Sequence, residues 1–61
     1  MKINFKIIRD RIQKRYQLDI ATANETTSLL MKDDFKRNKI VTTEQAMSFL
    51  DHLEKLGEQN A

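Results

Sequence analysis

The stretch Thr42–Gly57, TTEQAMSFLDHLEKLG, carries several agreeing helix signals and decides the fold. Thr42 stands three residues before Gln45, the spacing of a capping box in which each side chain satisfies a backbone N–H group. Gly57, the only glycine in the chain, is placed to end the helix in a left-handed conformation. The apolar residues recur at steps of three and four and form one stripe: Ala46, Phe49, Leu50, Leu53 and Leu56. The sequence predicts an amphipathic helix over residues 43–56, whose stripe the rest of the chain must cover.

A second helix is predicted over residues 23–37. Thr22 and Glu25 have capping-box spacing, Asn24 is a competing cap, and Asn38 can end the helix. Asp34 falls within the apolar face of this helix. Because an isolated buried carboxylate is costly, we expect Asp34 to stay partly exposed and to pair with an arginine.

The N-terminus fits two patterns. Residues 1–7 alternate between apolar and polar side chains, which is typical of a half-buried strand. A strand needs a partner, and the only other β-branched run is the short segment 40–42, unless two subunits pair. Four apolar residues also share one face of a helix that Asn4 could cap: Phe5, Ile8, Ile12 and Tyr16. We favour a helix over residues 5–18, with a short extended segment before it as the alternative.

These segments predict an all-α fold, a small three-helix domain over residues 1–57 followed by a frayed tail at 58–61. The predicted core consists of Phe5, Ile8, Ile12, Tyr16, Leu30, Met31, Phe35, Ala46, Phe49, Leu50, Leu53 and Leu56. The chain has 61 residues and no cysteine, so neither a large core nor a disulfide can stabilise it. It also has no apolar run of membrane-spanning length and no secretory signal, and we expect a cytoplasmic protein.

Self-association is the remaining route to stability for so short a chain. Ile3, Ile7 and Leu18 fall on a second side of the first helix, and Leu29 points away from the main face of its own helix. Pairing these surfaces across a two-fold axis would add the missing burial. We therefore expect a homodimer.

The residues needed for catalysis or metal binding are nearly absent. His52 is the only histidine, and with no cysteine a metal site is not expected. Ser28 and Ser48 lack a nucleophile motif, and a single glycine excludes a glycine-rich phosphate loop. We expect no enzyme activity and no cofactor.

The small net charge of +2 hides an uneven distribution. Residues 1–17 hold six basic residues and one acidic residue, a charge of +5, and residues 18–31 hold only Asp19 and Glu25, a charge of −2. Residues 32–39 hold four basic and two acidic residues, +2, and residues 40–61 hold one and four, −3. Two interpretations remain open. In the first, the basic first helix packs beside the acidic last helix, with Arg11 and Arg15 against its carboxylates. In the second, the basic residues converge on a face for nucleic acid or an acidic protein.

The second interpretation predicts a small regulatory protein that binds nucleic acid through a basic helical face. Its candidate nucleic-acid-binding residues are Arg11, Lys14, Arg15, Lys36, Arg37 and Lys39. The alternative is a protein-binding adaptor or inhibitor that acts through an exposed apolar or charged helix surface. A purely structural self-associating module is a third possibility. The size, the lack of cysteine and the charge density are common among small bacterial or phage regulatory proteins, which is an association of composition only.

Overall fold

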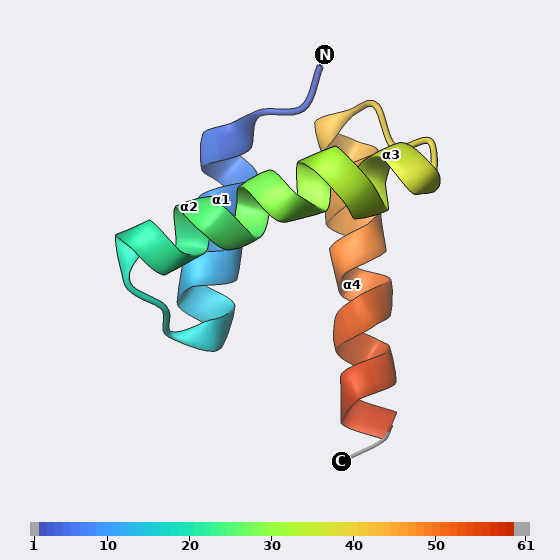
Figure 1. The fold of residues 1–61 in the computed structure, drawn as a ribbon. Helices are drawn as coiled ribbons and strands as arrows, with labels where there is room; N and C mark the ends of the chain where they lie inside the picture. The colour runs from blue at the N-terminus through green and yellow to red at the C-terminus, as the bar shows by residue number, and fades with distance from the viewer. Residues whose placement is uncertain (1, 60–61) are drawn as a thin grey trace.

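The computed structural model describes residues 2–59, and the side chains of residues 2–57. Two helices lie side by side and run in the same direction, and a third, longer helical segment crosses both of them on one face (Figure 1). The side-by-side pair is α1, Phe5–Tyr16, and α4, Thr43–Gln59; the crossing segment is α2, Ile20–Leu29, with η1, Leu30–Asp34, and α3, Phe35–Arg37. The prediction of an all-α domain of three helices is confirmed.

Both patterns at the N-terminus hold in part. Asn4 caps α1, because its Oδ1 accepts the N–H of Ile7 at 3.2 Å. The residues before this cap are extended, and Lys2 forms a single parallel β-bridge with Thr42, within the short β-branched run. Thr43 Oγ1 joins the two segments: it accepts the N–H of Asn4 at 2.8 Å and donates to the carbonyl of Lys2 at 3.2 Å. The N-terminus is thereby tied to the start of α4.

The boundary between the first two helices differs from the prediction. Helix α1 ends at Tyr16 rather than residue 18, because Gln17 adopts a left-handed conformation with φ of 53°. Helix α2 begins at Ile20 rather than residue 23, because Asp19 acts as the cap and accepts the N–H of Thr22 at 2.8 Å. Aspartate is a stronger cap than threonine, so it takes the place expected for Thr22. Hydrogen bonds from Thr22 also lower the pKa of Asp19.

The crossing segment contains one turn of π-helix, which the sequence pattern did not predict. In η1 the N–H of Phe35 bonds to the carbonyl of Leu30, five residues back. In a regular α-helix two residues at this separation lie about 140° apart, whereas a π-turn brings them toward one side. Asp34 consequently leaves the apolar face: its side chain is half-exposed and lies 3.9 Å from Arg37. This confirms the predicted pairing of Asp34 with an arginine.

Helix α4 begins as predicted and ends later. The capping box is present, with the N–H of Gln45 bonded to Thr42 Oγ1 at 3.1 Å and the N–H of Thr42 to Gln45 Oε1 at 3.3 Å. The prediction that Gly57 ends the helix is wrong, because α4 continues through this residue to Gln59 with no positive φ at the glycine. The predicted tail at 58–61 lies partly outside the described residues.

The core lies where the crossing segment covers α1 and α4. The residues buried there are Ile3, Ile8, Ile12, Ala23, Thr27, Phe35, Ala46 and Leu50. The ring of Phe35 packs edge-on against Phe49 with 5.8 Å between the centroids, and the hydroxyl of Thr27 donates to the carbonyl of Ala23 at 2.7 Å.

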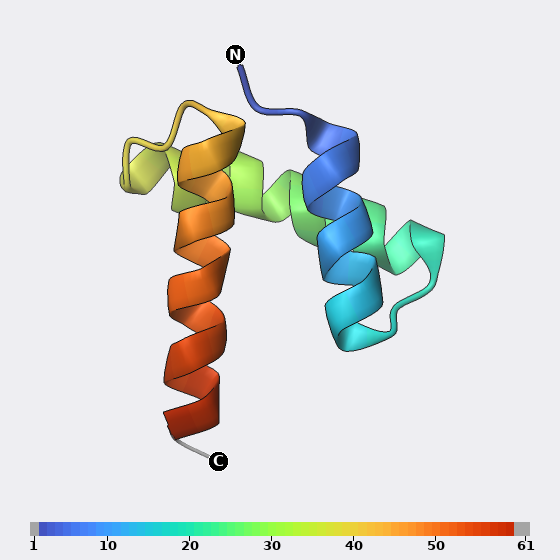
Figure 2. The same cartoon turned by 180° about the vertical axis from the view of Figure 1, so that it is seen from behind.

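Three predicted core residues are exposed: Tyr16 by 53%, Leu53 by 37% and Leu56 by 42%. The crossing segment meets α1 near its middle and α4 near its beginning, so the far ends of both helices are left uncovered (Figure 2). Ile3 differs in the opposite sense, because it belongs to the core rather than to an outward surface.

Candidate functional site

The uncovered ends of the helices enclose an apolar pocket of about 390 Å³. We call it the α1–α2–α4 pocket; its lining consists of Ile12, Tyr16, Leu18, Thr26, Leu30, Leu50 and Leu53. None of these residues is charged, and the hydroxyls of Tyr16 and Thr26 are the polar side-chain groups among them. The volume falls within the range of small ligand-binding sites.

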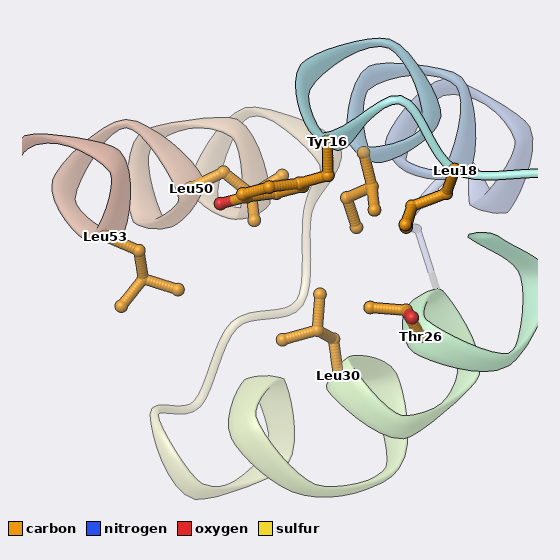
Figure 3. Close-up of a pocket in the computed structure, with 7 residues that line it drawn as sticks. Tyr16, Leu18, Thr26, Leu30, Leu50 and Leu53 are labelled. Atoms are coloured by element: carbon orange, nitrogen blue, oxygen red, sulfur yellow. The ribbon is translucent and has the colours of Figure 1, made fainter. Parts of the chain in front are cut away.

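Each wall of the pocket comes from a different part of the chain. Tyr16, at the end of α1, and Leu18, just after it, face Thr26 of α2 and Leu30 of η1 across the pocket, and α4 closes one side with two leucines (Figure 3). The π-turn starts at Leu30 and keeps this residue partly buried against the core, on the same side as Phe35. The pocket is therefore an extension of the core, left open on one side.

Along α4, the exposure of the residues on the pocket side increases toward the C-terminal end of the helix. Leu50 is 3% exposed at the core end, and the exposed Leu53 and Leu56 follow at helical spacing along the same stripe. Because Leu56 lies one turn beyond the lining, the apolar surface continues outward from the pocket. A ligand entering the pocket would meet an apolar ridge as well as a recess.

A charged clamp fixes α4 against α1 beside the pocket. The guanidinium of Arg11 donates to the carbonyl of Met47 at 3.2 Å, to Glu54 at 3.1 Å and to the carboxylate of Asp51. The hydrogen bond to Asp51, with further contributions from Glu54, raises the pKa of Arg11. Arg15 adds an ion pair with Glu54 at 3.6 Å. The carboxylates on this flank of α4 are thus matched by cations of the same chain.

The six predicted nucleic-acid-binding residues do not form one surface. Arg11 and Arg15 lie against the carboxylates of α4, which is the arrangement expected if α1 is a scaffold. Arg37 of α3 pairs with Asp33 of η1, one turn back in the crossing segment, at 2.7 Å, and this hydrogen bond raises the pKa of Arg37.

The three lysines of the predicted set are exposed but are split between two ends of the molecule. Lys14 is on the last turn of α1, whereas Lys36 is in α3 and Lys39 follows it. The end of α1 and α3 lie at opposite corners in both views (Figures 1 and 2). Lys36 and Lys39 therefore do not form a single patch with Lys14 and Arg15.

Sequence reasoning missed the pocket although it named most of the residues around it. Tyr16 and Leu53 were assigned to a closed core, Leu18 to an outer surface, and Thr26 to no role. No signal for the pocket was present in the sequence, because the helices predicted at 5–18 and 43–56 have equal lengths, whereas the 17 residues of α4 span about 26 Å and the 12 residues of α1 about 18 Å. The apolar stripe of α4 therefore extends beyond the end of α1, the neighbouring helix that could cover it.

The described residues offer little for other kinds of site. Among them no cluster of three or more histidine, cysteine, aspartate or glutamate side chains could hold a metal ion. No helix within residues 2–59 is long and apolar enough to cross a bilayer. Comparison of the chain with protein-family models, with curated proteins and with solved structures finds no match.

Proposed function

We propose that this chain is a small protein-interaction module whose contact surface is the α1–α2–α4 pocket together with the exposed end of the α4 stripe. The observation that carries this proposal is the pocket itself, lined without a single charged side chain and bordered by exposed large residues. Contiguous exposed apolar surface on a soluble domain marks an interaction site. The pairing of Arg11 and Arg15 within the chain supports the same choice, because these cations are engaged by α4.

An amphipathic helix is the partner element that fits best. Three helices already surround the pocket, and a further helix laid across its open side would cover the ends of α1 and α4. Helix-in-groove recognition places apolar anchors at positions i, i+3, i+4 and i+7 of the incoming helix. Tyr16 and Leu53 stand at the rim, where an aromatic and an aliphatic side chain can pack against such anchors.

Selection of helical peptides tests the proposal. A library with random residues at the anchor positions of an amphipathic helix is selected against the protein, and the bound peptides are mapped by amide chemical shifts. We expect the largest shifts at Tyr16, Leu18 and Leu53. The variant Leu53→Glu should weaken binding at least about tenfold, because an apolar anchor would meet a charge.

Val41→Glu is the matched control, because Val41 is an equally apolar exposed residue outside the pocket lining. It should bind the selected peptides as the wild type does. Peptides that bind Leu53→Glu as tightly as Val41→Glu, or a selection without any binder below about 100 μM, would contradict a working surface at the pocket.

Nucleic acid is a second candidate, favoured by one feature at the other end of the molecule. The β-bridge between Lys2 and Thr42 sets an exposed lysine beside the segment that follows α3, and Lys36 in α3 and Lys39 just after it are also exposed. Three lysines at one end could contact phosphates without help from the arginines of α1.

Fluorescence anisotropy with random duplex DNA in a salt series tests this candidate. Three phosphate contacts would give a slope of about −2.7 for log affinity against log salt. Lys36→Glu/Lys39→Glu should abolish binding, whereas Lys14→Glu, at the opposite corner, should leave it intact. Absence of binding at about 50 mM salt, or equal binding by the double variant, would remove nucleic acid as a candidate.

A further inference from the structure

We propose that the pocket of one chain is filled by the end of α4 from a second copy of the same chain, in a two-fold symmetric dimer. The inference rests on the proposed function, since it assigns an occupant to the same protein-binding surface. A foreign helix would then compete with self-association for the pocket.

The accessible surface of the chain is larger than that of a compact monomer. It exposes 4607 Å², whereas a folded monomer of 7.2 kDa exposes about 4,100 Å². The radius of gyration is 11.2 Å, against about 10.5 Å for a compact domain of this length. The excess of about 500 Å² is close to the area that each partner buries in the smallest specific interfaces. A second copy would cover an area of this size.

The surface around the pocket is complementary to itself. The recess lies between the helices, and beside it Leu53 and Leu56 form a ridge on α4. A two-fold axis places the ridge of each copy over the recess of the other, so that one patch makes both halves of the contact. Tyr16, on the wall of the recess that adjoins α4, would then pack against the leucines of the partner.

Charge also permits two copies to approach at this patch. The carboxylates of Asp51 and Glu54 are neutralised within the chain by Arg11 and Arg15. Because the pocket lining carries no charge, two identical surfaces meet there without like-charge repulsion. A strongly charged partner would find no opposite charge in the lining.

This surface replaces the one expected from the sequence. Ile3 is buried in the core and Leu18 lines the pocket, so Ile7 and Leu29 are the exposed members of that set. The expectation of a dimer is retained, and its interface moves to the pocket.

Sedimentation equilibrium from about 1 μM to about 500 μM tests the inference. The wild type should shift from 7.2 kDa toward twice that mass, 14.4 kDa. Leu53→Glu should weaken dimerisation at least about tenfold with its helical circular dichroism retained, because residue 53 is partly exposed in the single chain. Val41→Glu carries the same charge change outside the pocket and should dimerise like the wild type.

Isotope-filtered NOEs in a mixed labelled and unlabelled sample identify the contact directly. Tyr16 is the only tyrosine, so its ring signals are unambiguous. We expect NOEs from this ring to the methyl groups of Leu53 or Leu56 of the other copy. A dimer that survives Leu53→Glu, or that lacks these NOEs, would overturn the inference.

A wild type that stays at 7.2 kDa at every concentration would also overturn it. The proposed function fails separately: it stands if selected helical peptides still bind the pocket of such a monomer, and it falls if they do not.

Discussion

The two ends of the α4 stripe have the same sequence character and different surroundings. At the start of the helix Ala46 and Leu50 are buried beneath the crossing segment, whereas Leu53 and Leu56, farther along, are exposed. The hydrophobic spacing is continuous, so it cannot distinguish the two ends. The covered end forms the core, and the uncovered end forms the pocket and its ridge. Periodicity thus identifies the face of a helix that needs a partner, and the length and crossing of neighbouring helices decide which part of that face finds one.

The covered end should account for most of the stability. Phe35→Ala removes a fully buried ring that packs against Phe49, and we expect a loss of about 3–5 kcal/mol in the free energy of unfolding. Because a single core in a chain of this size supplies only about 3–5 kcal/mol, the variant should be largely unfolded at 25 °C. Circular dichroism at low micromolar concentration measures the loss of helix. Retention of the wild-type signal and urea midpoint would show that the core is not the main source of stability.

The contrast between the two ends can be measured on neighbouring leucines of one helix. Leu50→Ala should lower the free energy of unfolding by about 2–5 kcal/mol, because it leaves a cavity in the core. Leu53→Ala should cost about 1–1.5 kcal/mol, since its side chain is already partly in water and no closed cavity forms beside an open pocket. Urea unfolding of both variants, at a concentration low enough to keep the chain monomeric, gives the difference. Equal losses would mean that the pocket is closed in solution.

Local features of the fold could be predicted from the sequence, and the pocket could not. Asn4 and the Thr42–Gln45 pair act as caps because capping depends on residues three positions apart. The role of Gly57 was misjudged because a glycine can lie within a helix as well as end it.

The misassigned core has a different cause. Tyr16 and Leu53 have the spacing of core residues, and their exposure follows from the crossing of α2 and the unequal helix lengths, which are properties of the packed chain. The π-turn at Leu30–Asp34 likewise has no sequence signature of its own. The one indication was Asp34, a carboxylate on the apolar face of the predicted helix, which a regular α-helix would bury.

The clamp beside the pocket should have a smaller effect than the core. Arg11→Met keeps much of the aliphatic volume but removes the hydrogen bonds to α4. We expect the free energy of unfolding to fall by about 1–2 kcal/mol. This is less than the loss expected for a buried ion pair, because Asp51 is exposed and water screens its charge. Hydrogen exchange should increase along the second half of α4. Lys6→Met replaces an exposed cation on the same helix outside the clamp; it serves as the control and should change the free energy of unfolding little. Equal effects of the two substitutions would show that the clamp does not hold α4.

The smallest predicted effect lies at the outer end of the stripe. Gly57 has a helical conformation without positive φ, and a methyl group at this position would meet no atom within 4 Å. Gly57→Ala should therefore stabilise the helix by about 0.5–1 kcal/mol, because alanine loses less backbone entropy on folding than glycine. If the end of α4 is held in the pocket of a second copy, the same substitution should also tighten dimerisation, because a helix that is already ordered loses less conformational entropy on binding. Thermal unfolding at low concentration and sedimentation equilibrium separate these two effects. A lower stability in the monomer would mean that the chain leaves the helix at Gly57, as the sequence pattern had predicted.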